Sequence, residues 1–276
     1  MAGGLFGEIG PVGAAFLRVV LAALLLTPFG RAGLFSAGRR ALLAALLFGL
    51  VLAAMNSLFY LAIARIPLGV AVTLEFVGPL AVAASKPRRP LDLLWPALAA
   101  LGIALLWPRA SSPLSPLGMA LALASGGCWA LYILLSARIG RHFPGLSGLT
   151  LAMWAAALLL IPAAIGHGAI FSVPVLFRGL AVALLSSALP YGLELQALRS
   201  LSPQLFGILL SLEPAIAALM GLLLLGEGLS GAQLASIALV MAASAGASLS
   251  GGKGEAAQSD RIGLGDRSGL SESESR

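Results

Sequence analysis

The stretch LLSLEPAIAA, residues 209–218, places a glutamate directly before a proline inside a long apolar run. The stretch LEFVGPLAVA, residues 74–83, again places a glutamate shortly before a proline. A carboxylate at the centre of a membrane costs about 2.5–3.5 kcal/mol on insertion scales, and a proline removes a backbone hydrogen bond from a helix. Two such pairs therefore indicate helices that are interrupted beside a polar site. The pairs are Glu213 with Pro214 and Glu75 with Pro79.

The rest of the chain is almost as apolar as these two stretches. Of its 276 residues, 59% are hydrophobic and 10% are charged, whereas an ordinary soluble domain has about 25% charged residues. The mean hydropathy is +0.99. The composition therefore predicts a membrane protein that crosses the lipid bilayer several times.

Nine apolar blocks approach the length of roughly 20 residues that a membrane helix needs. They are 11–29, 41–64, 67–85, 91–107, 116–137, 147–166, 173–197, 203–225 and 231–249. Membrane strands are shorter, roughly 9–11 residues, and alternate polar with apolar positions. The sequence thus predicts an all-α membrane protein, a helical bundle with nine spans. We expect a disordered tail over 250–276, which is rich in glycine, serine and charge.

The basic residues favour one orientation of this bundle. Alternate loops and the tail contain most of them: Arg31, Arg39, Arg40, Lys86, Arg88, Arg89, Arg138, Arg141, Arg199, Lys253, Arg261, Arg267 and Arg276. The opposite loops contain Arg65, Arg109 and Arg178. The positive-inside rule therefore predicts a cytoplasmic C-terminus and an N-terminus outside. Because topology accounts for the formal charge of +6, we expect no nucleic-acid partner.

The positions of the blocks repeat with an offset of 135 residues. The first four blocks map onto the last four, and Pro79 maps onto Pro214. The fifth block maps to before residue 1, so we expect a five-helix unit whose first copy, 1–107, lacks its first helix. The second copy is expected over 116–249. An odd number of spans inverts the second copy, as in secondary transporters, whose sites lie near the midplane between the repeats.

Three charged residues within the blocks are candidates for binding substrate or protons. Helix rise places Glu75 and Glu213 near the middle of the membrane. A low dielectric favours the neutral form of a carboxyl group, so each could exchange a proton for a substrate ammonium group. Arg18 could hold a substrate carboxylate or pair with a glutamate. The alternative for each glutamate is a hydrogen bond to a neighbouring helix.

Other polar and aromatic residues recur at helical spacing and form stripes on the blocks at 41–64, 116–137 and 173–197. Such stripes can line a cavity or form hydrogen bonds between helices. The cavity-lining candidates are Asn56, Tyr60, Trp129, Tyr132, Tyr191, Glu194 and Ser211. Ser125 and Ser136 belong to the same stripe as Trp129, and Ser187 and Pro190 to that of Tyr191.

The sequence offers little support for catalysis or for a cofactor. Cys128 is the single cysteine, and His142 and His167 are far apart along the chain. This distribution favours neither a disulfide nor a metal site. The Walker A, GxSxG and HExxH patterns are absent from the sequence. We therefore expect no catalytic residue, metal or cofactor, and no enzymatic activity.

Several stretches resemble a known family. They are IPLGVAVTLEFVGPLAVA (66–83) with the following RRPLDLLW, GGCWALYIL (126–134), and LPYGLELQALRSLSPQLFGILLSLEPAIAALMGLLLLGE (189–227). Over nearly all of residues 10–249 the chain resembles the bacterial inner-membrane threonine and homoserine exporters, which belong to the EamA-type drug/metabolite transporter superfamily. The resemblance implies ten helices in two inverted repeats and export of small amino acids. It extends to Glu75, Pro79, Tyr191, Glu194, Glu213 and Pro214, without assigning a role to each.

The leading hypothesis is therefore a secondary exporter of small neutral amino acids in the bacterial inner membrane, driven by proton exchange. An exporter of drugs or other metabolites from the same superfamily is the nearest alternative. An intramembrane enzyme and a non-transporting scaffold are alternatives from other classes, and a homodimer is left open. The scaffold would not need carboxylates in the middle of the membrane.

Overall fold

The computed structural model describes residues 2–34, 38–84, 93–106, 114–143, 145–165, 168–190 and 209–249, and this part of the chain is helical, without strands. Its α-helices are α1 (Ala2–Leu34), α2 (Arg39–Ile63), α3 (Leu68–Glu75), α4 (Val77–Ala84), α5 (Leu94–Leu106), α6 (Pro116–His142), α7 (Ser147–Ala164), α8 (Val173–Ala183) and α11 (Glu213–Leu225). A 3-10 turn, η2 (Gly168–Phe171), precedes α8, and a π-helical segment, η3 (Leu184–Ala188), follows it. The C-terminal helix covers Gly231–Leu249. The predicted all-α class is confirmed.

Four helices of the described part are long and apolar enough to cross a membrane. They are Leu5–Gly30, Arg39–Ile63, Pro116–Ser136 and Gly231–Leu249. Shorter apolar helices cover Leu68–Val82, Leu94–Leu105, Ser147–Pro162, Val173–Ser187 and Glu213–Leu225. Each predicted block thus contains one apolar helix. The blocks 173–197 and 203–225 are described only in part, because residues 191–208 lie outside the described ranges, as does the predicted tail.

Helix α1 begins well before the predicted start at residue 11. It starts at Ala2 and bends at Gly10, whose φ of 69° and ψ of 167° are not helical. The segment before the bend buries Leu5 and Ile9 in one cluster with Tyr60 and Val175. Its glycines give it low helix propensity, so the sequence did not predict this helical turn. Tertiary packing therefore stabilises it.

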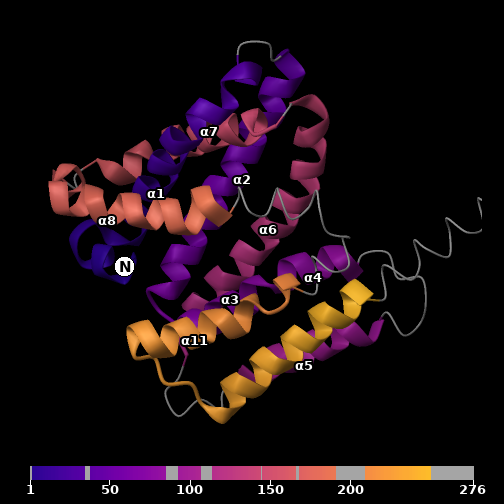
Figure 1. Ribbon diagram of the computed structural model, residues 1–276. Helices are drawn as coiled ribbons and strands as arrows, with labels where there is room; N and C mark the ends of the chain where they lie inside the picture. Colours follow the sequence, from indigo (N-terminus) through magenta and orange to yellow (C-terminus); the bar gives the residue numbers. More distant parts are fainter. Residues whose placement is uncertain are drawn as a thin grey trace, which may run out of the picture.

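The helices divide into two groups that α2 and α6 connect. In Figure 1, α1, α7 and α8 lie together in the upper part, and α3, α5, α11 and the C-terminal helix lie below. Helix α2 packs on both α7 and α6, and α6 also packs on α3 and α4. One apolar cluster joins α1, α2 and α7 through residues such as Val19, Phe48 and Met153. Another joins α4, α5 and the C-terminal helix through Leu80, Ala99 and Val240.

The helix that was predicted over 67–85 is interrupted, and α6 packs tightly against the interruption. Helix α3 ends at Glu75 and α4 begins at Val77, so the break lies at Phe76. Pro79 lacks the N–H that would bond to the Glu75 carbonyl four residues earlier. A methyl group on Gly126 of α6 would lie 2.5 Å from this carbonyl oxygen, and one on Gly78 would overlap the Gly126 carbonyl. Two glycines therefore allow the backbones to meet where the helix is broken.

This contact predicts a sharp difference between two adjacent glycines of α6. Gly126→Ala should lower the thermal unfolding midpoint of the detergent-solubilised protein by several degrees, because its methyl group meets backbone that cannot move aside; overpacking of this kind costs about 1–3 kcal/mol. Gly127→Ala is the matched control, since nothing lies within 4 Å of its added methyl group. Equal midpoints for the two variants would contradict the packing described here.

Candidate functional site

Glu75 is a buried carboxyl group at the broken end of α3. Only 8% of the residue is exposed. Its Oε1 lies 2.6 Å from the hydroxyl oxygen of Ser125 on α6. The same hydroxyl oxygen lies 2.9 Å from the carbonyl oxygen of Met55 on α2. Three helices thus meet at this carboxyl group through one serine.

Glu213 occupies a different place from that expected within a helix. It is the first residue of α11 and follows the turn at Ser211 and Leu212. Pro214 therefore lies in the first helical turn, where its missing N–H leaves no hydrogen bond unmade. The N-terminus of a helix also stabilises a negative charge. Whereas Glu75 is buried, Glu213 is exposed on the described chain.

Arg18 connects the middle of α1 to the π-helical segment after α8. Its Nε donates a hydrogen bond to Ser187 Oγ at 2.8 Å, and its Nη2 donates to the Ser186 carbonyl oxygen at 2.8 Å. In an α-helix that carbonyl would accept from residue 190, which is Pro190 and has no N–H. The guanidinium carbon also lies 5.7 Å from the centre of the Tyr60 ring, within the range of a cation–π interaction. A proline and a π-helical turn thus provide an acceptor for Arg18.

The three candidates for binding substrate or protons lie on three different helices, α3, α11 and α1. Glu75 interacts electrostatically with both Glu213 and Arg18. Helix α2 connects the surroundings of Glu75 and Arg18. Its Met55 carbonyl oxygen lies within hydrogen-bond distance of Ser125, the partner of Glu75, and its Tyr60 ring lies under Arg18. The arrangement combines two carboxyl groups with one guanidinium group. It can therefore attract both charged ends of a zwitterion.

The cavity-lining candidates make more ordinary contacts. Asn56 is 3% exposed and donates to the Leu52 carbonyl oxygen of its own helix at 2.8 Å. The Trp129 ring packs edge-on against Phe76, with 5.4 Å between centroids. The Tyr132 ring stacks on Phe48 at 5.0 Å, and Ser211 is buried. Whether these residues line a cavity remains a prediction, and Tyr191 and Glu194 lie outside the described residues.

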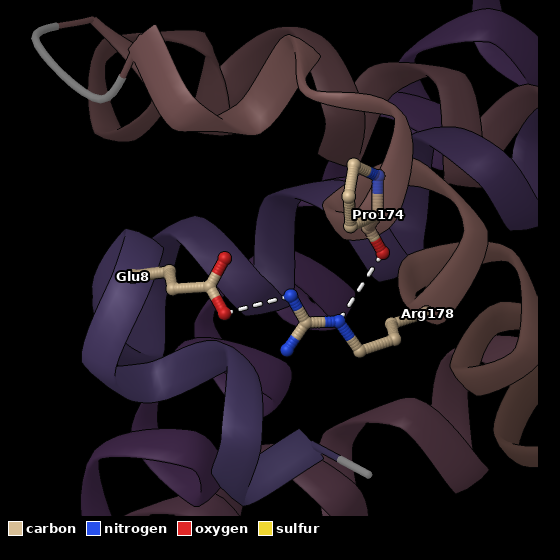
Figure 2. A network of polar contacts seen from close by, with 3 residues as sticks. All are labelled: Glu8, Pro174 and Arg178. Carbon is tan, nitrogen blue, oxygen red and sulfur yellow. Dashed lines mark hydrogen bonds and ion pairs between the residues drawn. The ribbon is translucent and has the colours of Figure 1, made fainter.

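Two further carboxylates connect helices away from these three residues. The Glu227 Oε2 accepts a hydrogen bond of 2.8 Å from the backbone N–H of Leu68, at the start of α3. Glu8 forms an ion pair of 2.7 Å with Arg178 of α8, and Arg178 also donates to the Pro174 carbonyl oxygen, as Figure 2 shows. Both partners of this pair are substantially exposed, so it contributes little stability. These contacts were not predictable from the sequence, because no local pattern pairs residues so far apart.

The described ranges contain no group of three His, Cys, Asp or Glu side chains that could hold a metal ion. Glu75 has Glu213 and Cys128 within electrostatic range, but these do not form such a group. The site that the described residues form is therefore one of carboxyl, hydroxyl and guanidinium groups.

The contact between Arg18 and Ser186 can be tested with a double-mutant cycle. Arg18→Met keeps the length of the side chain but removes its donors, and hydrogen bonds of charged groups contribute about 1.5–3 kcal/mol each. Pro190→Ala restores an N–H that can bond to the Ser186 carbonyl. We expect Arg18→Met to cost less stability in the Pro190→Ala protein, by about 1 kcal/mol. Chemical unfolding in detergent measures this, with Arg178→Met as the exposed control; purely additive losses would contradict the assignment.

Comparison with known proteins agrees with the resemblance seen in the sequence. The threonine/homoserine exporter RhtA of Salmonella typhimurium (strain SL1344) is 43% identical over 253 residues, which are 90% of this chain and 85% of that protein. RhtA of Escherichia coli (strain K12) shows the same identity and coverage. The pattern of the EamA-like transporter family matches residues 116–249. The chain therefore belongs to the EamA-like transporter family.

Proposed function

We propose that the protein is a secondary exporter of small neutral amino acids of the threonine and homoserine type, working by proton antiport in the bacterial inner membrane. The observation that carries this proposal is the buried Glu75, which has Glu213 and Arg18 within electrostatic range. The names of the relatives support the substrate class. Ionisable side chains are rare in membrane segments because they are costly there, and those that occur commonly belong to substrate or proton pathways.

The substrate would bind through its two charged ends. Its ammonium group would approach the carboxyl groups of Glu75 and Glu213. Its carboxylate would approach Arg18, since a guanidinium group offers five N–H donors in a planar fork. Two of these donors contact Ser186 and Ser187, and these contacts fix the plane of the fork. A small, uncharged side chain would add no further ionic requirement.

Protons would be exchanged at the same carboxyl groups. A substrate ammonium group favours the ionised carboxylate, whereas the low dielectric favours the neutral acid. Substrate and proton would thus compete for one negative charge. This competition would couple outward flux of the amino acid to inward flux of protons.

The packing of the helices supports the division into repeats over 1–107 and 116–249. Under the offset of 135 residues, α4 corresponds to the first part of α11. Helix α11 crosses α3, the other half of the interrupted helix, where a methyl group on Gly69 would lie 2.7 Å from Ala218 Cα. Helix α1 corresponds to α7 and packs on it, and α5 corresponds to the C-terminal helix and contacts it at Gly102. The pair α2 and α7 corresponds to α8 and α1, and both pairs are in contact. Such a relation suits two repeats that rock about a shared site.

Replacing the glutamates tests the proposed coupling. Glu213→Gln and Glu75→Gln should fold and insert, because an amide keeps the shape of a carboxyl group and, at the buried Glu75, removes a costly charge. Both should lose threonine efflux driven by an imposed pH gradient, while exchange of threonine for threonine can persist. The measurement uses proteoliposomes with radiolabelled threonine. Glu8→Gln is the control, because its carboxylate is exposed and paired with Arg178.

The same vesicles separate the proposal from its nearest alternative. If both variants respond to the gradient as the parent does, neither glutamate couples protons to transport. If the parent moves a cationic dye but not threonine, the amino-acid substrate class is wrong and an exporter of drugs becomes the better account.

A further inference from the structure

The hydroxyl group of Ser125 lies between oxygen atoms of two different helices. It is 2.6 Å from Glu75 Oε1 on α3 and 2.9 Å from the Met55 carbonyl oxygen on α2. A hydroxyl group has one hydrogen to donate, and a carbonyl oxygen can only accept. Ser125 therefore cannot donate to both neighbours at once. Which one receives its hydrogen depends on whether Glu75 carries a proton.

Two hydrogen-bonding states follow from this geometry. When Glu75 is neutral, its carboxyl O–H can donate to Ser125 Oγ, and Ser125 donates to the Met55 carbonyl oxygen. When Glu75 is ionised, its oxygens only accept, so Ser125 must turn its hydrogen toward Glu75. The Met55 carbonyl then keeps only the bond that it receives within α2. Loss of one proton from Glu75 thus removes one link between α6 and α2.

We propose that Ser125 is a positioning residue that converts the protonation of Glu75 into making or breaking the contact of α6 with α2. This inference rests on the proposed function, in which Glu75 exchanges protons. The contact of Gly126 with the Glu75 carbonyl holds α6 against α3, so Ser125 stays within reach of Glu75 in both states. The bond that changes is therefore the one to α2, the helix that places Tyr60 under Arg18.

The charge of Glu75 also responds to its other neighbours. Arg18 acts on it from α1 and Glu213 from α11, and Glu75 in turn acts on Cys128 of α6. The part of the pH dependence that Glu75 contributes therefore reflects this group of residues. Ser125 contributes through a direct hydrogen bond, so its removal changes the profile without adding or removing a charge.

The test is the pH profile of threonine exchange in proteoliposomes with equal pH on both sides. Ser125→Ala removes the hydrogen bonds of Glu75 with Ser125 in both protonation states. The bond to the ionised carboxylate is the stronger of the two, so the ionised form loses more stabilisation. The profile should therefore move toward higher pH by about one unit. A hydrogen bond to a charged group contributes about 1 kcal/mol more than one to a neutral group, and this difference corresponds to about one pH unit. Ser125→Cys, with a weak donor, should move it in the same direction and serves if the alanine variant does not insert.

Two matched controls separate this role from a general effect on packing. Ser136 on α6 bonds the Ile133 carbonyl oxygen at 2.9 Å, and Thr73 on α3 bonds that of Gly69 at 2.7 Å. Ser136→Ala and Thr73→Ala should both keep the parent profile. A parent-like profile in the inserted Ser125 variants would overturn the inference, even where Glu75→Gln abolishes the pH response. If Glu75→Gln keeps the full pH response, the proposed proton exchange itself fails.

Discussion

The close approach of two backbones, α4 at Gly78 and α6 at Gly126, is the constraint on which the site depends. It occurs where Pro79 leaves the carbonyl of Glu75 without a helical donor, so the carbonyl points at α6. A side chain at either glycine would separate the helices and take Ser125 away from Glu75. The same break ends α3 at the glutamate, which places its carboxyl group among three helices.

A second proline has a similar effect beside Arg18. Pro190 removes the donor for the Ser186 carbonyl, and Arg18 donates to it instead. In both places a missing backbone hydrogen bond creates a polar surface inside an apolar bundle. Helix α2 spans the distance between the two, with Met55 near Glu75 and Tyr60 under Arg18. A membrane protein can tolerate such freed groups where protein or water covers them.

The sequence predicted the class of fold and the approximate positions of the apolar helices in the described part of the chain, because these follow from composition and length. It also singled out Glu75, Glu213 and Arg18 as candidates, since a charge in an apolar run is conspicuous. It placed Glu213 inside a helix, although a glutamate followed by proline is typical of a first helical turn. The helical turn before Gly10 and the partner of Glu75 were not predictable locally. Leu5 is stabilised by contacts with distant residues, and Ser125 is 50 positions from Glu75.

Competition between substrate and proton for a buried carboxyl group would make substrate binding release a proton. The most direct measurement is the calorimetric heat of threonine binding to the detergent-solubilised protein in two buffers with different ionisation enthalpies. If binding releases a proton from Glu75, the heats differ between buffers, and the difference disappears at high pH and in Glu75→Gln. Threonine binding with the same heat in both buffers at every pH where the protein is stable would contradict this competition.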